Sequence, residues 1–252
     1  MKPTLLAFAL VVALSLTAAA QKPASSHHLA GGSGPGVKYT AGTSPQVPAL
    51  CRPCLFYGGD LNPDNINAAG LSDENTLLIP GGSSTYAAVN LPVAATVYGI
   101  VFNVQADAAF DPLQGTYDIR TGVSEGNGGT SVASGSGNVV VSQTGRNFLG
   151  LYEYTVALSW STAVTLNPGE YWFNVTPQCL NTLDGSCSVF RQFASTSQGA
   201  NSSHGNWQPV HELFLNSTYF GATWANWCDP QFGLDAAQCT GLSFGLRGSA
   251  SE

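Results

Sequence analysis

Aromatic and histidine side chains concentrate in one short stretch of the sequence, where they could bind a ligand. Residues 204–227 include Trp207, Phe214, Tyr219, Phe220, Trp224 and Trp227, together with His204, His211 and Glu212. Aromatic faces pack against sugar rings, and a nearby histidine can bond to hydroxyl groups, so we expect Trp207, Trp224 and His211 to bind carbohydrate. The alternative is that these rings fill the core of the fold.

Trp224 and Trp227 are three residues apart in the sequence. In a strand, side chains three apart point to opposite faces, so one of the two indoles should point away from the core. Cys228 follows Trp227 directly and favours a buried position for it, beside a disulfide bridge. We therefore expect Trp224 to be the exposed member of the pair.

Oxygen-bearing side chains alternate in the segment that begins at Asp60. Asp60, Asn62 and Asp64 have the spacing with which a tight loop wraps a hard cation, and calcium is the cofactor that this spacing predicts. The segment departs from the helix-loop-helix calcium template, because Asn65 replaces the required glycine and Leu71 replaces the bidentate glutamate. The alternative is a surface turn in which Asn and Asp side chains bond to their own backbone.

Six cysteines lie beyond the N-terminal segment, at Cys51, Cys54, Cys179, Cys187, Cys228 and Cys239. An even number in an oxidising compartment predicts three disulfides, and six cysteines allow fifteen pairings. The pairs closest in sequence are Cys51 with Cys54, Cys179 with Cys187, and Cys228 with Cys239. The Cys51–Cys54 spacing also occurs in redox-active dithiols, but no helix start after a parallel strand is expected here.

The sequence offers no recognisable catalytic group. Serine is abundant, but no G-x-S-x-G nucleophile elbow is present. Among the acidic residues, Asp118 and Glu153 lie opposite the apolar positions of their strands, as is typical of the solvated face of a sandwich. No pair of carboxylates therefore stands out as the acid and base of a glycoside hydrolase.

Composition narrows the fold class and the partners. The 252 residues include 29 glycines and 14 prolines, and charged residues make up 9%. This composition argues against solvent-exposed helices, whose outer faces need Glu, Lys and Arg. The net charge of −7 leaves no basic surface for nucleic acid.

The N-terminus has the pattern of a secretory signal peptide. Lys2 precedes an apolar run from Leu5 to Leu16, and Ala18–Ala20 supplies small residues for cleavage. The run is shorter than the roughly twenty residues that cross a bilayer, so we expect no membrane span after cleavage. We divide the chain into a signal peptide (1–20), a flexible Gly/Ser/Pro linker (21–48) and one domain (49–248).

Hydrophobic alternation with a period of two predicts β-strands along the domain. It is clearest in residues 98–104 and 152–160, with shorter runs at 116–120, 139–142, 171–175, 189–193, 212–215 and 242–246. Turn-forming clusters such as Asn167-Pro-Gly169 separate these runs. We predict an all-β fold, an antiparallel, jelly-roll-like β-sandwich with disulfide bridges.

Two segments carry a resemblance to other proteins. Gly115–Gly135 contains a strand and a Gly-rich loop, and Leu166–Val175 contains the pattern L-x-x-G-x-Y-W. In these motifs the chain resembles uncharacterised secreted bacterial β-sandwich proteins, over roughly residues 55–245. The resemblance implies a jelly-roll fold and assigns no catalytic residue.

Together these features predict a secreted, extracellular protein without catalytic activity. We expect it to bind carbohydrate or other cell-surface material. A secreted hydrolase that acts on polysaccharide and a structural component of the extracellular matrix are the alternatives. A pocket with two facing carboxylates would favour the hydrolase, and a groove with an exposed tryptophan would favour the binding protein.

We predict that the secreted protein begins near Gln21 and has no free thiol, because export delivers it to an oxidising space. Mass spectrometry of the unreduced protein, after treatment with an alkylating reagent, measures both properties. Several cysteines that become alkylated without prior reduction would contradict the prediction.

Overall fold

The computed structural model describes residues 46–61, 72–76, 79, 81–148, 150–179, 192–197, 208–227 and 241–250, with the backbone alone for 208–212. These residues form strands and one short 3-10 helix, η1 (Ala49–Cys51), so the predicted all-β class is confirmed. No helix in the described part of the chain has the length and apolar character needed to cross a membrane.

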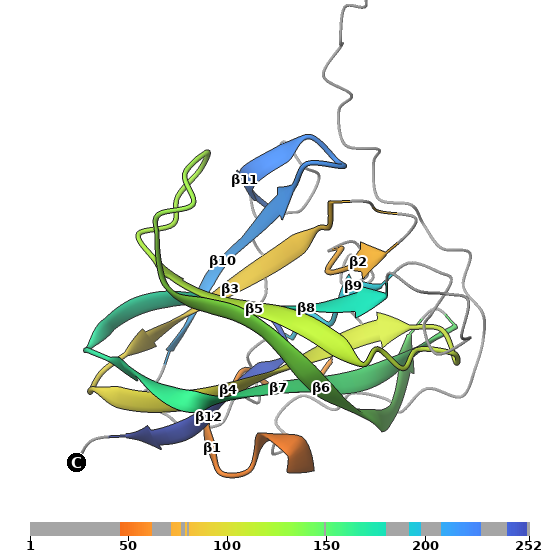
Figure 1. Cartoon of the computed structure of the whole chain (residues 1–252), viewed down its shortest axis with the longest axis horizontal. Coiled ribbons are helices and arrows are strands. Elements are labelled where there is room, and N and C mark those ends of the chain that lie inside the picture. Colours follow the sequence, from red (N-terminus) through yellow and green to blue (C-terminus); the bar gives the residue numbers. More distant parts are fainter. Residues whose placement is uncertain are drawn as a thin grey trace, which may run out of the picture.

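The strands form one continuous sheet that folds over into two layers (Figure 1). The first layer, called sheet I, contains in order β1 (Cys54–Tyr57), β12 (Phe244–Ala250), β4 (Ala95–Ala106), β7 (Leu151–Leu166) and the second half of β6 (Thr130–Phe148), with β9 (Phe193–Ala194) beside β4. The second, called sheet II, contains the first half of β6, then β5 (Gln114–Thr121), β8 (Gly169–Cys179), β3 (Ser84–Leu91), β10 (Gln208–Ser217) and β11 (Ala222–Asn226), with β2 (Asn75–Thr76) beside β8.

Strand β6 belongs to both layers. Its residues 130–138 pair with β5 in sheet II, and its residues 139–148 pair with β7 in sheet I. All these pairings are antiparallel, and the short β2–β8 contact is the parallel exception among the described strands. The antiparallel β-sandwich is thus present, while the jelly-roll connectivity stays a prediction.

The core lies between the two layers and follows the predicted alternation. From sheet I, Ile100, Phe102 and Val104 point inward and are completely buried. From sheet II, Phe173 and Val175 meet them and are also completely buried. Burial of large apolar side chains from both layers is the main term that holds the layers together.

The segment that contains η1 covers part of the outer face of sheet I. Cys51 of η1 packs against Val101 and Ala157, which point away from the central core. Cys51 and Cys54 form a disulfide, so this predicted pair is confirmed. Cys179 is also disulfide-bonded. Its partner and the remaining cysteines, Cys187, Cys228 and Cys239, lie outside the described residues, so the other two pairs stay predictions.

The expectation that Trp224 is exposed is wrong. Its side chain is 8% exposed and packs against Tyr86, with the ring centroids 4.6 Å apart, on the outer face of sheet II. Trp224 does point away from the central core, against which Trp227 packs, so the parity argument gives its direction correctly and fails only in treating that direction as exposure. Trp224 has a φ of 49°, a left-handed conformation. The loop before β6 then covers the ring, so closely that a Cβ on Gly128 would lie 2.4 Å from the indole.

We expect replacement of Trp224 with alanine to lower the free energy of unfolding by about 3 to 5 kcal/mol, because it empties a buried aromatic site. Tyr219 is 52% exposed and serves as the control, whose replacement with alanine should change stability by less than about 0.5 kcal/mol. Urea unfolding followed by circular dichroism measures both variants. Equal stability of the two variants would contradict the burial of Trp224.

Candidate functional site

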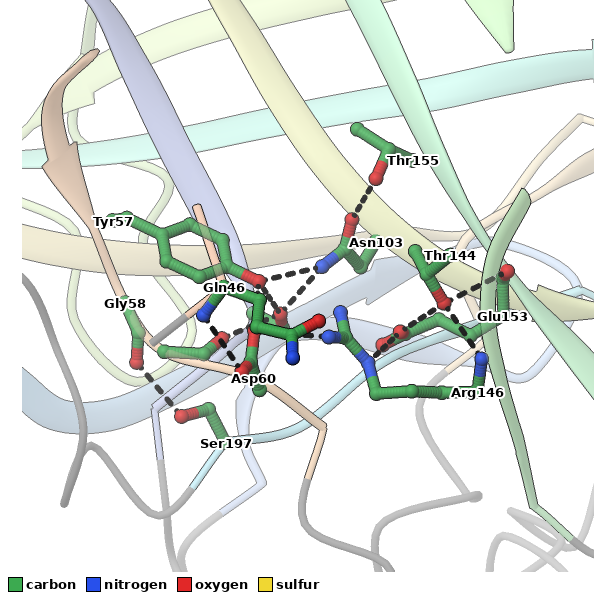
Figure 2. Close-up of polar contacts among 12 residues, drawn as sticks. Gln46, Tyr57, Gly58, Asp60, Asn103, Thr144, Arg146, Glu153, Thr155 and Ser197 are labelled. Carbon is green, nitrogen blue, oxygen red and sulfur yellow. Dashed lines mark hydrogen bonds and ion pairs between the residues drawn. The ribbon is translucent and has the colours of Figure 1, made fainter. Parts of the chain in front are cut away.

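A row of polar side chains crosses the outer face of sheet I. Because side chains alternate along a strand, the inward position of Phe102 places Asn103 outward on β4. Thr155 of β7 donates a 2.7 Å hydrogen bond to the Asn103 amide oxygen, and the Asn103 amide nitrogen donates to Ser243 at 2.7 Å. The same nitrogen donates to the Tyr57 hydroxyl at 3.0 Å, at the end of β1 (Figure 2).

A bulge in β6 brings Thr144 and Arg146 to Glu153. Gln143 pairs with Tyr154 and Asn147 with Tyr152, so three residues of β6 lie opposite Glu153 alone. Gly145 has a φ of 84°, a conformation that glycine adopts without strain and that such bulges require. Two side chains of one strand thereby reach the same carboxylate of its neighbour.

Arg146 lies between two carboxylates (Figure 2). Its Nε donates to the Glu153 carboxylate, and its Nη1 lies 3.1 Å from the Asp60 carboxylate. Thr144 donates a 2.8 Å hydrogen bond to the same Glu153 oxygen that Arg146 contacts. Asp60 also accepts hydrogen bonds from the Tyr57 hydroxyl and the Gln46 backbone nitrogen, each at 2.9 Å.

Burial and charge shift the pKa of several groups in this network. Burial raises the pKa of Glu153, and Arg146 opposes this rise. Burial works against the charged form of Arg146, but the nearby carboxylates outweigh it and raise its pKa above the ordinary value. Burial, with the charges of Asp60 and Glu153, raises the pKa of the Tyr57 phenol, so it stays a hydrogen-bond donor.

Glu153 corrects a second expectation from the sequence. It does point away from the central core, as the alternation predicts, but it is completely buried rather than solvated. The segment from Gln46 to Leu61 and the bulge in β6 close over this part of the face. Sequence periodicity missed the site because Arg146 and Asn103 have no distinctive spacing relative to Asp60.

A hollow of about 220 Å³ lies beside the network. Its lining consists of residues 46–50 on one side and Ser142, Gln143, Thr144, Arg146 and Thr155 on the other. Residues 47–50 are apolar, the other lining side chains offer hydroxyl, amide and guanidinium groups, and none of the described residues that line the hollow is acidic. The volume is below the roughly 300 Å³ at which sites for drug-sized ligands begin, so it suits a smaller polar molecule.

Two side chains that line the hollow have unused hydrogen-bonding groups. The Arg146 Nη2 also has no partner among the described residues, but it is buried. Ser142 and Gln143 are exposed, and neither side chain bonds to another part of the chain in the described structure. The hollow can therefore donate and accept hydrogen bonds without breaking the network behind it.

The two carboxylates of the network, Asp60 and Glu153, both form ion pairs with Arg146. Hydrolysis of a glycosidic bond needs two carboxyl groups that flank the bond, one of which gives or takes a proton. Asp60 and Glu153 instead share one guanidinium, and neither lines the hollow. This arrangement supports binding better than acid–base chemistry.

The predicted ligand and metal residues are placed only in part. Trp224 is the buried residue described above, Trp207 lies outside the described residues, and His211 is described in its backbone alone. Asp60 is engaged by Arg146 and Tyr57, while Asn62 and Asp64 lie outside the described residues. Among the described residues no three His, Cys, Asp or Glu side chains converge, and the calcium site stays a prediction.

Asp73 is a further buried carboxylate, at the point where β3 and β8 separate. One of its oxygens accepts hydrogen bonds from the Thr85 backbone nitrogen, the Asn174 amide and the Thr176 hydroxyl, at 3.2, 2.9 and 3.1 Å. Burial raises the pKa of Asp73 to about 7, although these hydrogen bonds oppose the rise. Asp73 is completely buried, so we assign it to the packing of sheet II rather than to chemistry.

Comparison with protein-family models, curated proteins and solved structures found no match for the chain. The resemblance to secreted bacterial β-sandwich proteins therefore stays a prediction, and the function must be argued from the site itself.

We predict that Asp73 makes the protein less stable as the pH rises from about 4 to about 7. Its native pKa of about 7 exceeds the ordinary value, so in this interval the native state binds more protons than the unfolded state. Stability then falls with pH by up to about 1.4 kcal/mol per pH unit. The Asp73→Asn replacement should reduce the dependence of stability on pH. The slope that is left in this variant comes from other groups whose pKa is raised, such as Glu153.

Thermal unfolding between pH 4.5 and 7.5 measures the slope of each variant. Asp111 is exposed, and Asp111→Asn is the control that should leave the slope unchanged. An unchanged slope in Asp73→Asn would show that the carboxyl group does not titrate in this interval.

Proposed function

We propose that the chain is a secreted, non-catalytic β-sandwich protein that binds carbohydrate in the hollow beside Arg146. The observation that carries this proposal is the lining of the hollow, which combines hydroxyl and amide side chains with the apolar residues 47–50 and contains no carboxylate among the described residues. Sugars present many hydroxyl groups, and a site of fixed donors and acceptors on a rigid sheet orients them at low entropic cost.

Two features support secretion. The N-terminal sequence has the charge, apolar run and small residues of a signal peptide. The Cys51–Cys54 disulfide is of a kind that persists in oxidising compartments and is rare in the cytosol. Carbohydrate of a cell surface or matrix would be accessible to the protein in that location.

A secreted polysaccharide hydrolase is the second candidate function. It needs a carboxylate pair that faces a substrate, and the described hollow offers none. The two buried carboxylates beside it are both paired with Arg146 and do not face a ligand. The geometry therefore favours the binding protein.

We expect the double variant Ser142→Ala, Gln143→Ala to weaken glycan binding at least about tenfold, because it removes hydrogen-bonding groups from two positions of the hollow. Both residues are exposed, so the free energy of unfolding should change by less than about 0.5 kcal/mol. A glycan array identifies the ligand, and calorimetric titration gives its affinity for each variant.

The matched control is Ser136→Ala, Gln114→Ala, which makes the same chemical changes at two exposed positions of sheet II. This control should bind as the unmodified protein does. A protein that binds no glycan on the array, or a hollow variant that binds like the control, would overturn the proposed function.

A further inference from the structure

We infer that the hollow accepts a neutral sugar residue and rejects acidic ones, because Asp60 and Glu153 cancel the charge of the Arg146 that faces it. This inference rests on the proposed function and names its class of ligand. It also assigns Asp60 and Glu153 a role as positioning residues that set specificity.

The first step concerns what a guanidinium group ordinarily selects. An arginine in a polar hollow attracts carboxylate, sulfate or phosphate, often through two parallel N–H donors. In this protein Nε is taken by Glu153 and Nη1 by Asp60. An acidic sugar therefore meets a guanidinium that already contacts two carboxylates and whose remaining nitrogen, Nη2, is buried.

The second step concerns the local charge. Arg146 contributes one positive charge, and two carboxylates lie in direct contact with it. Asp60 alone compensates the guanidinium, so even a protonated Glu153 would leave no net positive charge. The remaining side chains that line the hollow are uncharged, and the whole chain carries a net charge of −7. An anionic ligand would meet no attraction here and would be repelled at longer range.

The third step concerns the groups that a neutral sugar can reach. Nη2 of Arg146 is buried, so it is shielded from a ligand in the hollow. Ser142 and Gln143 are exposed and line the hollow, and their hydroxyl and amide groups offer both donors and acceptors to the hydroxyl groups of a neutral sugar. A volume of about 220 Å³ limits the ligand to a single residue, such as the end of a glycan chain.

The experiment compares neutral, uronate-containing and sulfated glycans on one array, and then titrates the best ligand of each class. We expect neutral glycans to bind with an affinity that changes less than about twofold between about 20 and 500 mM sodium chloride, since no charge pair forms. Uronate-containing analogues should bind at least about tenfold more weakly.

Glu153→Gln tests the cause of this selectivity. Loss of one of the two carboxylates on Arg146 takes the charge of this group of three side chains from −1 to zero, so it should remove repulsion and raise affinity for the uronate-containing glycan about tenfold. Asp118→Asn is the matched control, because Asp118 pairs with Arg120 on sheet II. It changes the net charge equally and should leave the preference unaltered. Asp60→Asn carries the same test if Glu153→Gln does not fold.

The outcomes separate the two proposals. An array on which nothing binds defeats the proposed function and this inference with it. Binding that prefers uronate or sulfated glycans and weakens strongly with salt defeats the inference but leaves carbohydrate binding intact. An unchanged preference in a folded Glu153→Gln or Asp60→Asn variant shows that the two carboxylates do not set the specificity.

Discussion

Strand β6 sets the geometry of the whole sandwich, because it pairs with β5 in one layer and with β7 in the other. The two layers must diverge where β6 leaves sheet I, and the gap between them is closed by a stacked pair of rings. Tyr117 and Trp160 lie 4.1 Å apart and nearly parallel, one from each layer. Trp160 belongs to a stretch of β7 in which four residues lie opposite Tyr98 alone, so this strand also bends at the point of divergence.

The bulge near the end of β6 is the second consequence of this arrangement. It aims Thr144 and Arg146 at Glu153, and so creates a buried charge network beside an open hollow. Burial of charge is costly, and a buried ion pair often adds little net stability over apolar packing. We therefore assign this network the role of fixing the position and charge of the Arg146 guanidinium, rather than that of stabilising the fold.

Both layers have outer faces that are partly covered. On sheet I the cover is the segment from Gln46 to Leu61, which the Cys51–Cys54 disulfide constrains. On sheet II the loop that contains Gly128 covers Trp224 and Tyr86. A side chain that points away from the central core can therefore be as deeply buried as one that points into it. The hollow lies on sheet I beside such a cover, which brings residues 46–50 against β6 and β7.

The sequence alone determined the central strands of the sandwich and which of their side chains share a face, but it did not reveal β1, β3 or β11. Alternation placed Ile100, Phe102 and Val104 together, and the spacing of Cys51 and Cys54 made their disulfide the simplest local pairing. Tertiary structure alone decided which outward faces are covered. Glu153 and Trp224 were assigned to solvent because a period of two reports the direction of a side chain and nothing about what lies above it. The cover comes from Asp60, Arg146 and Gly128, whose approach depends on bulges and on a left-handed residue that no periodicity encodes.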